Sequence, residues 1–131
     1  MNIYIHIPFC KSKCYYCDFF SKSNQEKLEE DYVDAQIEEI EHEGLEKYDI
    51  ETVYIGGGTP SILSSRNIGR IIQKIRKSLD KNAEITIEVN PGTVSYEDLE
   101  DYISFGINRI SIGLQTAENR LLKEIRKNTY L

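Results

Sequence analysis

The sequence has few cysteines, no long apolar run and no basic patch, and each of these absences excludes a class of protein. Its three cysteines cannot all pair with one another, so a complete disulfide framework is excluded. The first ten residues lack the positively charged start of an export signal, and no stretch approaches the length of a membrane span. We therefore expect a cytoplasmic protein, with no membrane contact indicated.

The charge distribution also argues against a nucleic-acid partner. The formal net charge is −6, and residues 24–43 carry nine acidic side chains against one lysine. The acidity therefore belongs to one segment, and the rest of the chain is slightly basic. A charge run of this kind is typical of the solvated face of a helix, whereas nucleic-acid binding requires a basic surface.

The order of short segments predicts βα units. The 131 residues have the length of one domain, and 40% hydrophobic residues can bury a core of ordinary size. No linker divides the chain, so residues 1–131 are expected to form one domain. Runs rich in β-formers alternate with segments of helical periodicity. The expected strands are Asn2 to Ile7, Thr52 to Ile55, Glu84 to Val89 and Arg109 to Gly113.

The segment between the first two strands predicts a helix from Ser23 to about Gly44. Ser23 and Glu26 form a capping-box pattern at its start. Two apolar triplets predict a buried stripe on this helix: Leu28, Tyr32 and Ala35, and Val33, Ile37 and Ile40.

Three more helices are expected. A third begins near Ser95, whose capping partner is Asp98, and ends near Gly106. A fourth carries Leu121, Leu122 and Ile125. The second helix, which precedes these two in the sequence, has a basic and polar face opposite an apolar stripe. The stripe has helical spacing and is formed by Ile68, Ile71, Ile72, Ile75 and Leu79.

Strands that are separated by crossover helices pair in parallel, and right-handed connections wind them the same way. The sheet is therefore expected to form an open α/β fold or part of a barrel, with ligands beyond the carboxyl ends of its strands. An unusual residue or cluster of residues follows each of the four strands, namely Cys10 to Cys17, Gly56 to Pro60, Asn90 to Thr93, and Gln115. We therefore predict that the four loops carrying these residues converge on one site.

Cys10, Cys14 and Cys17 place three thiols within eight residues, close enough for one loop to surround a single metal centre. A [4Fe–4S] cluster normally takes four cysteine ligands, so three would leave one iron open for catalysis. The lysines of this loop add positive charge that favours thiolates. On spacing alone, zinc with His6 as fourth ligand and a purely structural role remain alternatives. For His6 itself, a packed and hydrogen-bonded side chain is favoured.

Four ordered motifs cover most of the chain, and they are Tyr4 to Cys10 with the C-x3-C-x2-C loop, Gly56 to Ser61, Glu88 to Pro91, and Asn108 to Gln115. Together they resemble the radical S-adenosylmethionine (SAM) proteins of the anaerobic coproporphyrinogen III oxidase and heme chaperone group. The resemblance favours the cluster over zinc. It also implies an α/β fold, a partial (β/α) radical SAM barrel of about four parallel βα units.

The resemblance implies that Cys10, Cys14 and Cys17 bind three irons of a [4Fe–4S] cluster, while SAM chelates the fourth. Reductive cleavage of SAM would then supply a 5′-deoxyadenosyl radical. The resemblance also implies which residues contact SAM. Gly57 and Gly58 would contact its methionyl end, Tyr4 would lie near its carboxylate, Tyr16 near its adenine and Glu88 at its ribose. Gln115 would lie in the site, and Thr59 would reach toward a second ligand site.

Plainer interpretations of these residues stand beside the resemblance. The run Gly56 to Gly58 removes three side chains and lets the backbone approach a ligand closely, but a glycine triplet is also common in flexible turns. A glutamate at a strand end is often a surface charge, and tyrosines such as Tyr4 and Tyr16 often pack in a core. Arg109, at the start of a strand, is expected to be structural.

The segment after Cys17 reads Asp18-Phe19 and has no further cysteine. This form matches the heme chaperone branch, because the oxidase branch has an additional cysteine there. We therefore expect a protein that binds heme or porphyrin and passes heme to an acceptor, with an electron donor that the sequence does not identify. The alternatives are an oxygen-independent coproporphyrinogen III oxidase (dehydrogenase) that makes protoporphyrinogen IX, and a zinc-stabilised binding module without turnover. Whether the chain is an enzyme stays open.

The resemblance also has consequences for the end of the chain. Residues 125–130 stand where the family has a Gly-Arg-x-His segment, so the expected arginine contact to SAM is missing from the pattern. Family members have more βα units and a C-terminal region. The chain is therefore expected to be a radical SAM core truncated on its C-terminal side and inactive alone.

Overall fold

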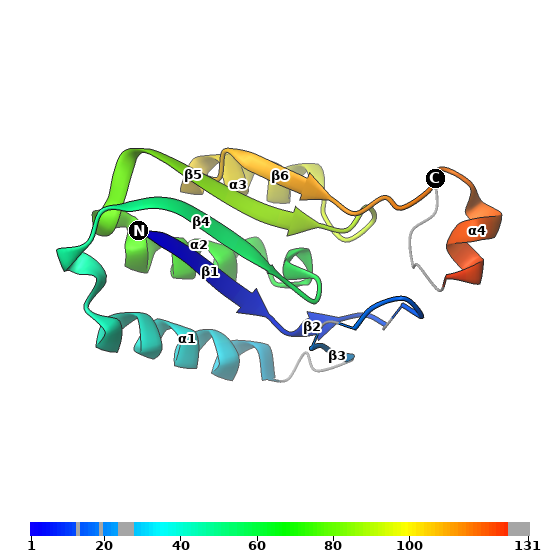
Figure 1. Ribbon diagram of the computed structural model, residues 1–131, viewed down its shortest axis with the longest axis horizontal. Helices are drawn as coiled ribbons and strands as arrows, with labels where there is room; N and C mark the ends of the chain where they lie inside the picture. Colours follow the sequence, from blue (N-terminus) through cyan, green and yellow to red (C-terminus); the bar gives the residue numbers. More distant parts are fainter. Residues whose placement is uncertain (13, 19, 24–27, 126–131) are drawn as a thin grey trace.

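The computed structural model describes residues 1–12, 14–18, 20–23 and 28–125. Its central feature is a parallel sheet of four strands in the order β1-β4-β5-β6. The strands are β1 (Asn2–Ile7), β4 (Ile50–Gly57), β5 (Leu79–Val89) and β6 (Arg109–Ile112). The helices that connect them are α1 (Glu29–Glu43), α2 (Ser65–Ile75) and α3 (Tyr96–Phe105). The predicted βα alternation and parallel pairing are confirmed (Figure 1).

Several short elements complete the fold. Strand β2 (Phe9–Cys10) pairs in parallel with β3 (Lys22–Ser23) in a separate two-stranded sheet. Helix α4 (Asn119–Glu124) follows β6. Single 3-10 turns lie at Leu45–Lys47 (η2), Pro60–Ile62 (η3) and Arg76–Ser78 (η4). None of the helices in the described part of the chain is both long and apolar enough to cross a membrane.

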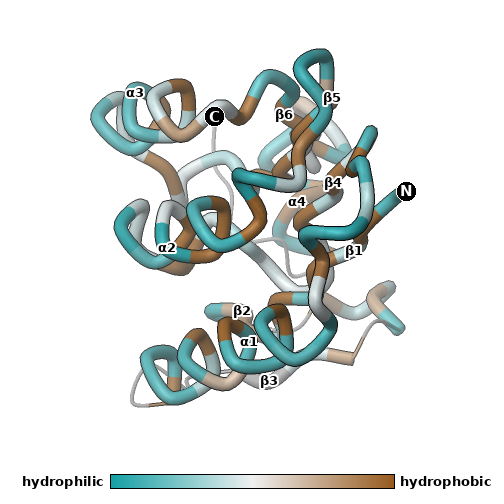
Figure 2. Tube along the Cα trace, turned by 90° about the vertical axis from the view of Figure 1, so that its left-hand side faces the viewer, coloured by the Kyte–Doolittle hydropathy of each residue, from teal (hydrophilic) through white to brown (hydrophobic). Residues whose placement is uncertain are grey.

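The two faces of the sheet differ in chemistry. In Figure 2, α1, α2 and α3 lie along one side of the strands, and the other side carries no helix of this group. Alternate strand residues face the helices and are buried with the isoleucines of α2, and this core includes Ile7, Val53, Ile55, Ile85, Ile87, Ile68, Ile71, Ile72 and Ile75. The intervening strand residues are polar or aromatic, so the opposite face is suited to a ligand rather than to a helix.

Ion pairs account for part of the acidic run in α1. Arg70 of α2 binds Glu30 at 3.0 Å and also Asp34, and Lys74 binds Glu41. These side chains are partly exposed, so each pair contributes little stability. The acidic run is thus a solvated helix face, as expected, with one edge turned toward the basic side of α2.

Two predicted helix boundaries are wrong. Ser23 lies in strand β3, in register with Cys10, so the first helix does not begin there; Glu26, its expected partner in the capping box, lies outside the described residues. Helix α1 instead begins after Leu28 without a side-chain cap, and it ends as predicted at Gly44, which adopts a left-handed conformation with φ of 57°. Leu79 lies in β5 because the η4 turn ends the second helix early.

The stripe predicted for α1 is only partly correct. Val33 is fully buried, and Ile37 and Ile40 pack against the core. Tyr32 is also partly buried, whereas Leu28 is 46% exposed and Ala35 is exposed. In α4, Leu122 is buried and the helix ends one residue before Ile125.

The capping box of α3 is confirmed. The Ser95 hydroxyl accepts a hydrogen bond from the Asp98 backbone N–H at 3.1 Å, and the Asp98 carboxylate accepts from the Ser95 N–H at 2.8 Å. These bonds from Ser95 lower the pKa of Asp98. The helix ends at Gly106, as predicted, with φ of 100°.

Replacing Ser95 by alanine should lower the free energy of unfolding by about 1 kcal/mol, as is usual for loss of an N-cap hydroxyl. Because the folded-state pKa of Asp98 is lowered, the stabilisation by this carboxylate is present at neutral pH. It is lost as the pH falls through the folded-state pKa. Urea denaturation of wild type and Ser95→Ala should therefore show a difference that shrinks below a pH of about 4.

Ser104→Ala serves as the control, because Ser104 is an exposed residue of the same helix outside the capping box. A wild-type to Ser95→Ala difference that stays constant with pH would show that Asp98 takes no part in the cap.

Candidate functional site

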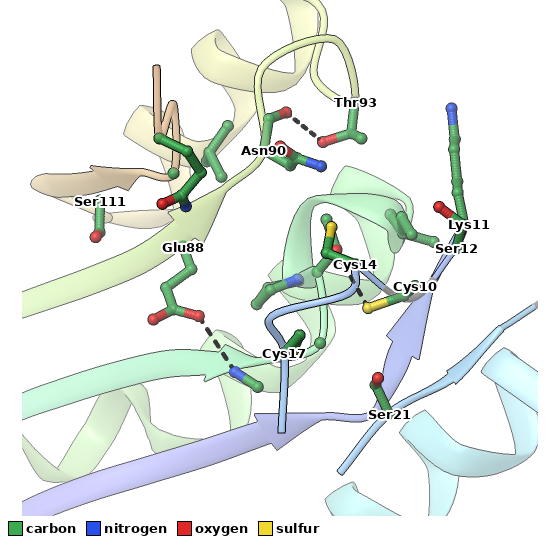
Figure 3. A pocket seen from close by; sticks show the side chains of 18 of the residues that line it. Cys10, Lys11, Ser12, Cys14, Cys17, Ser21, Glu88, Asn90, Thr93 and Ser111 are labelled. Carbon is green, nitrogen blue, oxygen red and sulfur yellow. Dashed lines mark hydrogen bonds between the residues drawn. The ribbon is translucent and has the colours of Figure 1, made fainter. Parts of the chain in front are cut away.

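A pocket of about 220 Å³ lies at the carboxyl ends of the strands. Its walls come from the cysteine loop, the loop after β4, the loop after β5, and the end of β6 with the residues that follow it (Figure 3). The predicted convergence of four loops is therefore confirmed. Parallel pairing is the reason, because it brings the carboxyl ends of all strands to one edge of the sheet.

All three cysteines line this pocket. No disulfide joins these cysteines, and all three are partly exposed. The Cys17 N–H donates to the Cys14 carbonyl at 3.2 Å, which forms a turn, and the Thr59 hydroxyl donates to the Cys10 sulfur at 3.5 Å. Among the described residues, no three His, Cys, Asp or Glu side chains already converge as a metal site. The loop thus supplies three soft donors to one pocket without holding them around one point.

Backbone hydrogen bonds fasten the start of the cysteine loop to the loop after β4. The Gly58 N–H donates to the Ile7 carbonyl and the Thr59 N–H to the Phe9 carbonyl, each at 2.7 Å. Farther along the loop, the Tyr15 N–H donates to the carbonyl of Ile125, just after α4, at 3.2 Å. Residues far apart in the sequence therefore hold the cysteine loop at the strand ends.

The glycine run is required by the packing of the protein itself, in addition to any approach of the backbone to a ligand. A Cβ on Gly57 would lie 2.8 Å from the His6 ring and from the Ile7 carbonyl, and one on Gly58 would lie 2.5 Å from the Phe9 carbonyl. Gly57 also has φ of 118°, a region that favours glycine. Gly56 and Gly57 belong to β4, so they are not in a flexible turn. Gly57 and Gly58 still line the pocket.

The Glu88 carboxylate lines the pocket and is held from two sides. Its Oε1 accepts a hydrogen bond from the Tyr54 hydroxyl at 2.7 Å, and its Oε2 accepts from the Gly57 N–H at 3.3 Å. The bond to Glu88 raises the pKa of Tyr54, because a phenolate there would face a carboxylate. Glu88 is therefore a fixed acceptor rather than a free surface charge.

Tyr4 lies outside the pocket lining. It is 56% exposed, its ring stacks on that of Tyr54 with centroids 6.1 Å apart, and its hydroxyl is 3.2 Å from Nδ1 of His6. The Nε2 atom of His6 lies 3.0 Å from the Phe20 carbonyl. His6 is thus hydrogen-bonded, as favoured from the sequence, and it connects β1 to the segment that follows the cysteines.

The remaining predicted contacts, Tyr16, Thr59 and Gln115, line the pocket together with the cysteines. Tyr16 is half exposed, so it is not a core residue. Gln115 has φ of 68°, a conformation that residues other than glycine rarely adopt. Arg109 lies outside the pocket lining and contacts Glu84 at 3.4 Å, in agreement with the structural role expected for it.

Several polar residues of the site were not predicted. Tyr54 lies two residues before the glycine run. The signal available in the sequence was the alternation of side chains along the strand, which places Tyr54 on the face opposite the buried isoleucines. Ser61 and Thr93 join the second and third loops through hydroxyls 2.5 Å apart, and Thr93 also donates to the Asn90 carbonyl. The Ser21 hydroxyl lines the pocket and has no hydrogen-bond partner among the described residues. A ligand in the pocket can supply the hydrogen bond that this hydroxyl lacks.

Comparison with known proteins agrees with this geometry. The chain is 42% identical over 132 residues to a protein named "Heme chaperone HemW" from Buchnera aphidicola subsp. Schizaphis graminum, covering 97% of this chain and 35% of that relative. It is 38% identical over 130 residues to the protein of the same name from Escherichia coli, covering 95% of this chain and 34% of the relative. The chain thus spans about a third of the length of these curated relatives.

A solved structure supports the fold as well. Coproporphyrinogen III oxidase (HemN) from Escherichia coli, described as a radical SAM enzyme, matches with a TM-score of 0.89 and 28% identity, over 98% of this chain and 31% of that one. The family model described as the radical SAM superfamily matches residues 4–130. Because this match takes in nearly every residue, the chain belongs to the radical SAM superfamily.

Proposed function

We propose that this chain carries the cluster and SAM site of a radical SAM heme chaperone. The observation that carries the proposal is the C-x3-C-x2-C loop, whose three thiols line the same pocket as Glu88 and the Gly57 and Gly58 backbone. Membership of the superfamily implies a [4Fe–4S] cluster and SAM. When bound, the cluster supplies the electron that cleaves SAM.

The donor set suits an iron–sulfur cluster. Cys10, Cys14 and Cys17 offer three thiolates and leave one iron for SAM. Zinc would need a fourth ligand, and His6, the candidate, is already hydrogen-bonded to Tyr4 and to the Phe20 carbonyl. Binding a cluster would require the three sulfurs to come together around one centre.

The pocket offers SAM complementary groups on several walls. The Glu88 carboxylate can accept hydrogen bonds from two ribose hydroxyls, and the half-exposed Tyr16 ring offers a surface for adenine. The backbone at Gly57 and Gly58 leaves room for the methionyl end, and Thr59 and Gln115 add polar groups. Tyr4 would act from outside the lining, near the methionyl carboxylate.

The heme chaperone branch is favoured by the segment after Cys17, which lacks a further cysteine, and by the names of the curated relatives. On this proposal the protein binds heme and passes it to an acceptor. Oxidative decarboxylation of coproporphyrinogen III is the second candidate, because the solved structure that matches carries that name.

Anaerobically prepared protein should contain about four irons per chain and show a broad brown absorption, as expected for a cubane cluster. Cys10→Ala, Cys14→Ala and Cys17→Ala should each abolish it, because each thiolate would hold a different iron. The measurements are iron and acid-labile sulfide content, with Ser104→Ala as a control outside the pocket. A colourless protein with one zinc, or full iron in any single cysteine variant, would contradict the assignment.

Glu88→Gln should weaken SAM binding about tenfold, because a charge-assisted hydrogen bond contributes roughly 1.5–3 kcal/mol and this carboxylate is only partly buried. Glu51→Gln, an exposed change at the other end of the sheet, should leave the affinity unchanged. Equal SAM affinity in wild type and Glu88→Gln would remove Glu88 from the site.

Gly57→Val should lower the melting temperature and the iron content together, since its side chain would meet His6 and the Ile7 carbonyl.

The two candidate activities are separated by offering the reduced, SAM-loaded chain heme and coproporphyrinogen III under nitrogen. We expect heme binding, seen as a shifted Soret absorption, and no protoporphyrinogen. Stoichiometric protoporphyrinogen formation would reject the chaperone proposal in favour of the oxidase.

A further inference from the structure

Tyr54 and Glu88 occupy different rows on the open face of the sheet. Tyr54 is in register with Tyr4 on β1 and with Thr86 on β5. Glu88 belongs to the next row and is in register with Ser111 on β6. Residues offset by two positions on neighbouring strands are farther apart than direct partners, so they meet only when a long side chain has a clear path.

Gly56 provides that path. It is in register with His6, in the row next to that of Tyr54. A Cβ at Gly56 would lie 2.9 Å from Cε1 of Tyr54 and 3.1 Å from Oε2 of Glu88. Gly56 is absent from the glycines with positive φ, so its backbone conformation does not require glycine. Its missing side chain instead leaves the space in which the Tyr54 ring and the Glu88 carboxylate meet.

The resulting contact fixes the carboxylate. Tyr54 donates to Oε1 at 2.7 Å and Gly57 donates from its N–H to Oε2 at 3.3 Å, so each oxygen has one donor among the residues that the structure describes. A carboxylate oxygen has two acceptor sites, so each retains one for a ligand. Tyr54 does not line the pocket, whereas Glu88 does. The stacked Tyr4 ring supports Tyr54 on its other side.

We propose that Tyr54 is a positioning residue of the SAM site: reaching over Gly56, its hydroxyl orients the Glu88 carboxylate so that both oxygens face the vicinal hydroxyls of the ribose. This inference rests on the proposed function. It assigns the specificity for a vicinal diol to a pair of residues, only one of which touches the ligand. Gly56, rather than Gly57 or Gly58, is the glycine that this arrangement needs.

The test measures SAM affinity by equilibrium dialysis, under nitrogen, on cluster-loaded wild type and Tyr54→Phe. We expect Tyr54→Phe to weaken SAM binding about three- to tenfold while the iron content is unchanged, because one hydrogen bond to the carboxylate is lost and the fold is kept. Tyr96→Phe is the matched control, since Tyr96 is 75% exposed at the start of α3 and loses the same hydroxyl.

Two further measurements distinguish positioning from a general structural effect. In a Glu88→Ala background, Tyr54→Phe should cause no additional loss of affinity. The preference of the protein for S-adenosylhomocysteine over its 2′-deoxy form should fall in Tyr54→Phe but not in Tyr96→Phe. Gly56→Ala gives an independent variant, because its methyl group pushes the two side chains apart without removing either, and it should lower the same preference.

The possible outcomes separate the two proposals. Wild-type protein that binds no SAM would reject the proposed function, and this inference with it. Wild-type protein that binds SAM, with Tyr54→Phe binding equally well, would reject the positioning role alone. A loss in Tyr54→Phe that persists in the Glu88→Ala background, or an unchanged ribose preference, would also reject it.

Discussion

The parallel pairing of β4 with β1 on one side and β5 on the other is the constraint on which the rest of the structure depends. Because all four strands point the same way, the cysteine loop and the loops after β4, β5 and β6 end at one edge of the sheet. No single segment forms the pocket. If β4 were displaced from the sheet, both the anchor of the cysteine loop and the backbone donor to Glu88 would be lost.

The alternation of side chains along these strands divides structural from functional roles. Ile55 and Ile87 face the helices and form the core, whereas Tyr54 and Glu88 face the open side. Burial of the isoleucines against α2 provides the stability, since apolar area removed from water is the main favourable term in folding. The open face is then able to carry polar groups that would be costly in the core.

The glycines after Ile55 illustrate how one motif serves several needs. Gly57 and Gly58 let the end of β4 pass close to His6 and to the backbone near Phe9, which holds the cysteine loop in place. Gly56 leaves space for two side chains to meet. The motif therefore shapes the pocket through the packing around it, and substitutions within it are expected to have different consequences at each position.

The sequence by itself determined the βα order, the parallel sheet, the C-terminal end of α1, both ends of α3, and the loops that form the site, because these follow from local periodicity, capping residues and strand direction. The cysteine spacing and the ordered motifs were sufficient to indicate the family. Only the tertiary structure decided that Ser23 pairs with Cys10 in a strand, that Tyr4 lies outside the pocket, and that Tyr54 reaches Glu88 over Gly56. These features depend on strand register and on contacts between residues far apart in the chain, which local sequence patterns do not encode.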